Sequence, residues 1–207
     1  MIQQFSPNML KTFQECPKKF HLKYVKNVTM PVNDEIFETG KNIHALASYY
    51  LKKQDISKLE QALNNDEKTM WEYLKKTVYT SFETINTEYN LTFKLENYFF
   101  SGRLDALVKD ENKFYILDYK TGSAPKEAKY DFQTIIYLLA VKKYFKTNNI
   151  EFVYLDLNRQ TNTCICFDEK LELEYEKRLI DIANRINTEN YVKNLQICPC
   201  EYKILCF

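Results

Sequence analysis

The sequence has few of the residues that make a chain flexible, since its 207 residues include only 3 glycines and 5 prolines. No low-complexity run accompanies them, so the composition argues against flexible linkers and disordered tails. No stretch of about 18 apolar residues occurs, which excludes an ordinary membrane-spanning helix. The composition is 45% hydrophobic, enough for a real core, and we expect one folded domain over residues 1–207.

The chain also lacks an excess of either charge. Its 29 basic and 28 acidic side chains leave a net charge of +1, so composition does not indicate a nucleic-acid-binding protein, and a basic surface would require local clustering. Residues 1–10 have neither the basic flank nor the apolar run of a signal peptide, and we expect a cytoplasmic protein that does not associate with membranes. In that compartment the six cysteines are expected to be buried thiols, redox thiols or ligands, and not structural disulfides.

Residues 1–87 largely follow a helical period and are expected to form a helical part of the domain. Ser6-Pro7 resembles an N-cap followed by the first helical residue, and Pro17 should kink this helix or restart it. A second expected helix begins in the run TGKNIHALASYYL. A third is expected from about Asp66 to Asn86, because its apolar residues recur at helical spacing.

Several polar side chains in these elements have ordinary explanations when each is taken alone. Cys16 on the first helix is better explained as a small buried hydrophobe than as a ligand. His44 on the second is better explained as a satisfied, partly buried histidine. Cys164 and Cys166 share one face of a short expected strand, and we interpret both as structural.

Residues 88–168 show a different pattern, because the apolar period changes to two and predicts a three-stranded meander. The expected strands and turns are EYNLTFKL, a turn at Glu96-Asn97, YFFSGRLDALV, a turn at Glu111-Asn112, and KFYILDYKT. The elements expected after the meander are a helix from about Lys126 to Lys146, strands EFVYLDLN and TCICF, and a helix from about Glu169 to Asn187. This order predicts an α+β fold in which a helix crosses over between strands of the sheet, followed by a C-terminal part over residues 169–207.

Two aspartates face each other in the second expected hairpin. If its turn has two residues, the numbers of paired residues sum to 223, which places Asp105 opposite Asp118, and alternation puts Lys120 on the same face as Asp118. Opposed like charges destabilise an antiparallel pair, so a cation is needed between them, and a hard divalent cation would serve. Taken alone, the patch is better explained as a charged hairpin surface neutralised by Lys120 and Arg103, because structural ion pairs are common.

A further pair, Gln133 and Tyr137, lies four residues apart on one helix face and by itself fits a solvated glutamine beside a core tyrosine. With the histidine of GKNIHALA, the first acid of GRLDALV and the acid-x-lysine of LDYKTG, however, this pair completes an ordered set of four motifs. The chain resembles the RecB-like branch of the PD-(D/E)XK nuclease superfamily, including CRISPR-associated spacer-acquisition nucleases and the nuclease domains of bacterial helicase-nucleases. The resemblance covers nearly the whole chain and implies a restriction-endonuclease-like core, with a central mixed sheet flanked by helices.

The resemblance implies a metal site. His44, Asp105, Asp118 and the backbone carbonyl of Tyr119 would bind one or two Mg²⁺ or Mn²⁺ ions. Imidazole together with carboxylate and carbonyl oxygens suits Mn²⁺ especially, and Mg²⁺ less strictly. Such a cation would neutralise phosphate oxygens, stabilise the charge of the transition state and lower the pKa of a bound water.

The same resemblance implies the other catalytic roles. Beside the aspartates Asp105 and Asp118, Lys120 would position the attacking water or stabilise the charge next to it. Gln133 and Tyr137 would orient the DNA strand or the lysine. Basic residues could flank a groove for the phosphate backbone, although a solvated helix face explains them equally well. These residues are Lys11, Lys18, Lys19 and Lys23 on the first helix, and Lys126 and Lys129 near the later one.

The end of the chain is rich in cysteine, with Cys198, Cys200 and Cys206 in the last ten residues. In the iron-sulfur members of this nuclease branch, one cysteine near the N-terminus and three near the C-terminus hold a [4Fe-4S] cluster, and Cys16 stands where the first ligand would be. The family has two residues between the first two C-terminal cysteines, whereas here Cys198 and Cys200 are separated by one. Zn²⁺ bound by four cysteines is the chemical alternative, because tetrahedral sulfur suits either.

The resulting expectation is a metal-dependent DNA nuclease that hydrolyses phosphodiester bonds. Its expected role is that of an exonuclease, or of a nuclease that processes single strands or ends, in DNA repair, recombination or CRISPR adaptation. The expected partners are DNA, single-stranded or with free ends, and other DNA-processing or CRISPR adaptation proteins. The alternative is a non-catalytic DNA-binding or scaffolding subunit with the same fold. A degenerate active site would indicate this alternative, but no acid or lysine of the motifs is missing from this sequence.

Overall fold

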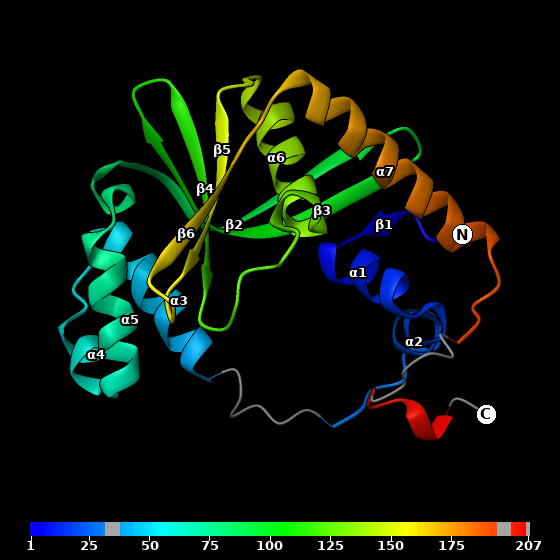
Figure 1. Ribbon diagram of the computed structural model, residues 1–207, viewed down its shortest axis with the longest axis horizontal. Coiled ribbons are helices and arrows are strands. Elements are labelled where there is room, and N and C mark those ends of the chain that lie inside the picture. The colour runs from blue at the N-terminus through cyan, green and yellow to red at the C-terminus, as the bar shows by residue number, and fades with distance from the viewer. Residues whose placement is uncertain (32–37, 194–199, 206–207) are drawn as a thin grey trace.

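The computed structural model describes residues 1–31, 38–193 and 200–205. Within them a six-stranded mixed sheet lies between helices, which confirms the expected α+β fold class (Figure 1). The strands are β1 (Gln4–Phe5), β2 (Glu83–Leu95), β3 (Tyr98–Asp110), β4 (Lys113–Lys120), β5 (Ile150–Asp156) and β6 (Thr161–Cys166). The helices are α1 (Pro7–Glu15), α2 (Pro17–Phe20), α3 (Glu38–Leu51), α4 (Ser57–Ala62), α5 (Asn65–Lys76), α6 (Phe132–Phe145) and α7 (Glu169–Thr188). No helix within these ranges is long and apolar enough to cross a membrane.

The first helix begins and ends as expected. The Ser6 hydroxyl accepts a hydrogen bond from the Met9 amide at 3.4 Å, and a proline follows in the first turn of α1. The helix stops before Cys16 and restarts as α2 at Pro17. Cys16 lies between the two helices, and its Sγ atom accepts a hydrogen bond from the Lys19 amide at 3.5 Å. Pro17 therefore restarts the helix instead of kinking it.

The expectation of a helix reaching Asn86 is wrong. The helix α5 ends at Lys76, a short 3₁₀ turn spans Val78–Ser81, and β2 begins at Glu83. The segment TVYTSFETINT is rich in β-branched residues, which favour a strand over a helix. Its apolar residues nevertheless recur at helical spacing, so periodicity alone could not separate the two. Pairing with the long strand β3 decides the outcome.

The helix expected from about Lys126 also begins later than predicted, at Phe132. A separate 3₁₀ turn occupies Ala128–Tyr130. The Asp131 side chain then caps α6 by accepting a hydrogen bond from the Gln133 amide at 2.9 Å. A capping aspartate satisfies an amide that has no partner inside the helix, which sets the helix start.

The three-stranded meander and its turns are confirmed. β2 and β3 are antiparallel around a turn that pairs Leu95 with Tyr98, and β3 and β4 are antiparallel with Ala106 paired to Leu117. The second register has the expected sum of 223. The chain then crosses over through α6 to β5, which is parallel to β4, and β6 returns antiparallel to β5. β4 therefore has a neighbour on both sides.

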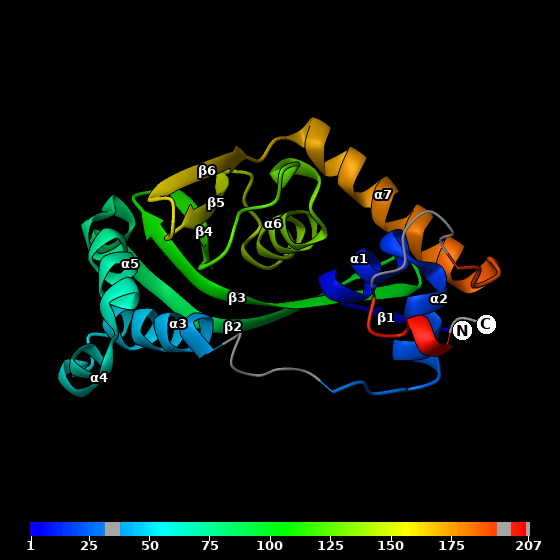
Figure 2. The same ribbon diagram turned by 60° about the horizontal axis from the view of Figure 1, so that its bottom comes forward.

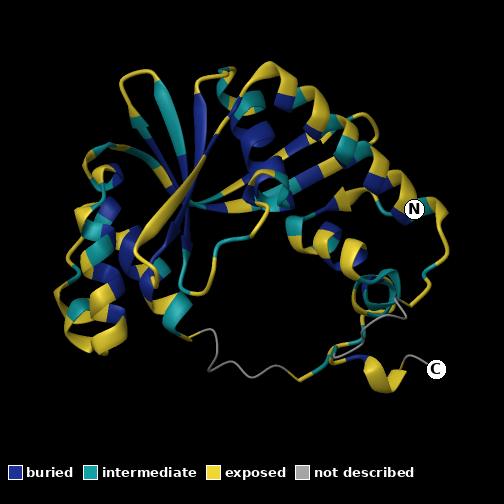
Figure 3. Cartoon of the chain, viewed as in Figure 1, coloured by how far each residue is buried: buried dark blue, intermediate teal, exposed yellow. Residues whose placement is uncertain are grey.

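Helices cover both faces of the sheet (Figure 2), and each face carries a hydrophobic core. One core joins α1, α6 and α7 to the sheet, and the other joins α3 and α5 to it. Every residue of β5 is buried, as expected of a strand covered on both faces, and Figure 3 shows β5 and much of α6 in the buried colour. The strands β3 and β4 consequently lie between two packed layers.

β2 and β3 both change the direction of their side chains near the middle of the sheet. On β3, Leu104 belongs to the core on the α6 side, whereas Ala106 belongs to the core on the α3 side. On β2, Tyr89 packs on the α6 side, whereas the Thr87 hydroxyl contacts a serine hydroxyl of α3 at 2.6 Å. Residues two apart normally share a face, so an irregularity lies between them on each strand. On β2 it is Glu88, whose φ of 51° is left-handed.

Candidate active site

Three of the four residues expected to bind metal contact one another where α3, β3 and β4 meet. Nδ1 of His44 lies 3.2 Å from Oδ1 of Asp105, and Nε2 lies 2.9 Å from the carbonyl oxygen of Tyr119. The Tyr119 amide donates to Oδ2 of Asp105 at 2.9 Å. Burial lowers the pKa of His44, but the hydrogen bond and charge of Asp105 raise it more, so the net shift is upward. The helix and both strands are thus tied together by one set of contacts.

The fourth expected ligand, Asp118, is held by a different pair of side chains. The Lys120 ammonium lies 2.7 Å from Oδ2 of Asp118, and the Gln133 side-chain amide donates to Oδ1. Gln133 also accepts a hydrogen bond from Lys120 at 3.1 Å, which closes a triangle. Burial, followed by the charge of Asp105, raises the pKa of Asp118 to about 7 against the opposing effect of Lys120. The site therefore contains a carboxylate that is costly to ionise without more positive charge nearby.

Tyr137 contacts the sheet and not an open surface. Its ring is buried, and its hydroxyl donates to the carbonyl oxygen of Arg103 at 2.8 Å. The ring lies against Gly102, where a Cβ atom would be 2.2 Å from Cε1 of Tyr137. Only glycine leaves room for this contact, and the sequence analysis did not single out that residue. Tyr137 thus contacts β3, whereas Gln133 contacts the lysine, and the role expected of both in orienting the DNA strand or the lysine stays a prediction.

Glu88 is a candidate ligand that the sequence analysis missed. Its carboxylate oxygen Oε2 lies 2.9 Å from Nε of Arg103. In the pairing of β2 with β3, the numbers of paired residues sum to 193 near the middle of the strands. This register places Glu88 opposite Asp105. The same arithmetic that related Asp105 to the next strand would have found it. Its left-handed backbone is an unusual conformation for glutamate, and such conformations gather at functional sites.

Side chains with suitable ligand atoms gather at this point. Among the described histidine, cysteine, aspartate and glutamate residues, His44, Glu88 and Asp105 form a group whose ligand atoms all lie within 4.8 Å of one another. An imidazole and two carboxylates match the ligands that Mn²⁺ and Mg²⁺ accept. Asp118 lies outside this group because Lys120 and Gln133 hold it, although its charge acts on His44.

The cysteines are only partly described. Cys198 and Cys206 lie outside the described residues. Cys16 is partly buried beside the junction of α1 and α2, and Cys200 is partly buried at the start of the last described turn. The two cysteines interpreted as structural, Cys164 and Cys166, are exposed on β6. They therefore contribute little to either core.

Comparisons with known proteins bear on the family of the chain. A family model described as the PD-(D/E)XK nuclease superfamily matches residues 4–207. The CRISPR-associated exonuclease Cas4 of Francisella tularensis subsp. novicida (strain U112) is 24% identical over 122 residues, which are 57% of this chain and 61% of that protein. The alignment thus spans less than two thirds of this relative's length.

A solved structure shows the same fold. It is a candidate exonuclease from Eubacterium rectale, with a TM-score of 0.59 at 12% identity over 96% of this chain and 86% of its own. An identity this low shows the fold alone. The family match, in contrast, covers nearly every residue, including His44, Asp105, Asp118 and Lys120. The resemblance expected from the sequence is therefore confirmed, and this chain belongs to the PD-(D/E)XK nuclease superfamily.

Proposed function

We propose that this chain is a metal-dependent deoxyribonuclease that hydrolyses phosphodiester bonds and acts as one nuclease domain. Membership in a nuclease superfamily supports hydrolysis. The observation that carries the finer proposal is the meeting of two aspartates, a lysine and a histidine between the two cores: Asp105, Asp118, Lys120 and His44. The similarity to a CRISPR-associated exonuclease supports single-stranded DNA or DNA ends as substrate, in CRISPR adaptation, repair or recombination.

His44, Glu88 and Asp105 would hold the divalent cation, with Asp118 and the carbonyl of Tyr119 beside them. The donor set fits, because it supplies one imidazole and carboxylates close together. When bound, Mg²⁺ or Mn²⁺ supplies positive charge for the phosphate oxygens and lowers the pKa of the attacking water. The raised pKa of Asp118 supports the same assignment, because a nearby cation would favour its ionised form.

The protein's own residues would hold the reacting groups in place. Lys120 would stabilise negative charge on the phosphate or hold the attacking water, and Gln133 fixes its ammonium at 3.1 Å. Asp118 holds that ammonium in place through the 2.7 Å ion pair. Tyr137 would act indirectly, because it fixes the backbone of β3 two residues before Asp105.

For the cysteines we propose one [4Fe-4S] cluster, with a Zn²⁺ site as the chemical alternative. Its ligands would be Cys16, Cys198, Cys200 and Cys206. Supporting contacts bring the turn after Cys200 to the N-terminal region, where Lys203–Leu205 lies near α2 (Figures 1 and 2). These contacts are the hydrogen bond from the Tyr202 hydroxyl to the Val28 carbonyl at 2.9 Å and the ion pair of Lys19 with Glu201 at 3.4 Å.

Digestion of end-labelled DNA tests the proposed function. Single-stranded and duplex DNA of one sequence would be incubated with the purified protein in Mn²⁺, in Mg²⁺ and in EDTA. We expect cleavage only with metal, and a loss of about 100-fold or more in Asp105→Ala and Lys120→Met. Asp105→Ala removes a metal ligand, and Lys120→Met removes positive charge that acts on the phosphate. Lys68→Met, an exposed lysine of α5, is the matched control and should cleave like wild type.

The metal ligands are tested by titration. His44→Ala and Glu88→Gln should raise the Mn²⁺ concentration for half-maximal cleavage about tenfold or more, with no loss of DNA affinity in EDTA, because they remove metal ligands and not phosphate contacts. Equal Mn²⁺ requirements would contradict these assignments. DNA binding by wild type without cleavage in either metal would instead establish a non-catalytic DNA-binding subunit.

A further inference from the structure

A groove runs along α3 beside the candidate metal site. It has a volume of 680 Å³, and its walls include two candidate metal ligands, His44 and Glu88. Lys41 and Tyr49 of α3 and Lys52, just after the end of α3, also line it. Lys41 and Lys52 are eleven positions apart, which corresponds to about 16 Å along a helix. The groove is therefore longer than a metal site needs, and it is continuous with that site through His44 and Glu88.

The groove is lined by positive charge with little compensation. Within the part of the chain that the structure describes, no carboxylate forms an ion pair with Lys41 or Lys52. Arg103 also lines the groove, and its side chain is 64% exposed although it pairs with Glu88. By contrast, Lys11 and Lys19, two of the lysines expected to flank a phosphate groove, are paired with the carboxylates of Asp131 and Glu201. Uncompensated cations beside a nuclease site favour a phosphate backbone.

An exposed aromatic ring lies between these lysines. Tyr49 is 46% exposed, and no other aromatic ring of the described residues stacks on it. Single exposed aromatic residues are common and carry no meaning by themselves. This ring, however, lines a cationic groove, and a base can stack on tyrosine with little loss of side-chain entropy. Tyr144 of α6 is more exposed, at 63%, but its ring contacts the rings of Tyr89 and Phe145, and it does not line the groove.

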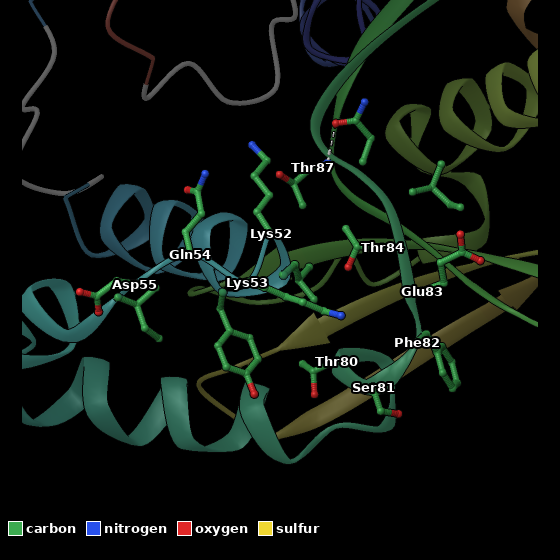
Figure 4. A pocket seen from close by; sticks show the side chains of 15 residues that line it. Lys52, Lys53, Gln54, Asp55, Thr80, Ser81, Phe82, Glu83, Thr84 and Thr87 are labelled. Carbon is green, nitrogen blue, oxygen red and sulfur yellow. Dashed lines mark hydrogen bonds between the residues drawn. The ribbon is translucent and has the colours of Figure 1, made fainter.

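A second hollow lies beside Lys52. This cavity has a volume of 940 Å³ and lies between the segment after α3 and the start of β2 (Figure 4). Lys52 lines both hollows, and Figure 4 shows Lys52 and Lys53 extending in different directions from the end of α3. The group of metal-ligand side chains found among the described residues is not part of its lining. The second hollow therefore shares Lys52 with the groove and none of the candidate metal ligands.

We infer that this groove binds a single-stranded segment of nucleic acid that leads to the candidate metal site. One base stacks on Tyr49, and the phosphates contact Lys41, Lys52 and Arg103. The inference rests on the proposed nuclease function and names the form of substrate that the site takes. Stacking selects a single strand, because in a duplex both faces of each base are covered by neighbouring bases.

Binding without cleavage tests the inference. Fluorescence anisotropy in EDTA would measure the affinity of wild type and variants for a labelled single strand of about 20 nucleotides. Tyr49→Ala should weaken binding about 5- to 100-fold, whereas Tyr49→Phe should stay within about twofold. Tyr144→Ala is the matched control and should bind like wild type. A strand of abasic units, or a duplex of the same sequence, should bind equally to wild type and Tyr49→Ala.

The lysines are tested by salt dependence. Lys41→Gln and Lys52→Gln should each lower the slope of log affinity against log salt concentration by about 0.7, whereas Lys68→Gln should leave it unchanged. Equal single-strand affinity of wild type and Tyr49→Ala would overturn the inference, as would a slope that neither lysine changes. Thermal unfolding of each variant would verify that it is folded.

The cleavage assay separates this inference from the proposed function. If wild type cuts DNA with Mn²⁺ while the Tyr49 and lysine variants bind and cut normally, the proposed binding in the groove is wrong and the proposed nuclease function is supported. If wild type binds single strands through Tyr49 but cuts no DNA, the nuclease function is wrong and the groove stands.

Discussion

At the scale of single residues, the ionised form of Asp118 that would help to bind a cation is also the form that destabilises the metal-free fold. Its side chain is 1% exposed, and burial together with Asp105 raises its pKa to about 7. A carboxyl group with a raised folded-state pKa favours folding in its protonated form. Its contribution to stability is therefore present below the unfolded pKa of about 4 and is lost as the pH rises through the folded pKa. Lys120 opposes this loss without removing it.

Asp118→Asn should therefore abolish cleavage while making the metal-free protein at least as stable as wild type at about pH 8. The amide keeps the shape of the side chain and removes a buried charge. Thermal unfolding in EDTA at several pH values would show a Tm difference in favour of the variant that grows from about pH 4 to about pH 8. Asp181→Asn, at an exposed position of α7, is the control and should follow wild type. A variant less stable than wild type at about pH 8 would show that the ion pair with Lys120 outweighs burial.

At the scale of elements, the contact between α6 and β3 fixes the position of the β3 backbone next to Asp105. Tyr137 of α6 reaches the carbonyl of Arg103, and its ring occupies the space over Gly102. The strand irregularity that contains Asp105 follows immediately. The helix thus holds the strand in the segment that precedes the catalytic aspartate.

Gly102→Ala should destabilise the fold by about 1–3 kcal/mol, because the new Cβ atom collides with the Tyr137 ring. Urea unfolding would measure the loss of unfolding free energy in Gly102→Ala, in Tyr137→Leu and in the double variant. The loss in the double variant should be smaller than the sum of the two single losses, because leucine leaves room for the added Cβ atom. Gly122→Ala is the matched control: an added Cβ meets nothing within 4 Å, and we expect a change below about 0.5 kcal/mol. Additive losses at Gly102 and Tyr137 would contradict the collision.

At the scale of the whole molecule, the N-terminal segment contacts the end of α7 and the segment after it. The Ile2 amide donates to the Asn187 side-chain oxygen at 2.7 Å, and the Asn187 amide donates to the Ile2 carbonyl at 2.9 Å. The rings of His21 and Tyr191 are stacked, with their centroids 4.7 Å apart. A cluster bound by cysteines from both ends would close a loop that spans most of the chain, and loop closure restricts the unfolded state.

Cys16→Ser should therefore remove the bound metal and lower the Tm of the whole protein, because metal binding free energy becomes folding free energy. Anaerobically purified wild type should contain about four irons per chain and be brown, as thiolate-bound clusters are. Cys164→Ser, at an exposed strand position, is the control and should keep the iron. One zinc per chain in a colourless protein would replace the cluster with a zinc site, and a metal-free protein with the Tm of Cys16→Ser would rule out both.

Local features could be predicted from the sequence because they depend on residues close together in the chain. The start of the first helix at Ser6 follows from its capping hydroxyl, and the register of β3 and β4 follows from a two-residue turn. The order of the four motifs likewise predicted the family. The relation of Glu88 to Asp105 could have been predicted in the same way, from the turn at Glu96-Asn97.

Tertiary structure decided the features that depend on elements far apart in the sequence. The apolar spacing after Lys76 fits a helix, and it becomes a strand because β3 offers partners along the whole length of β2. The change of face at Glu88 cannot be read from alternation, because it satisfies two cores on opposite sides of the sheet. The groove at Tyr49 likewise exists only because α3 packs beside β2 and β3, since a helix alone has no second wall.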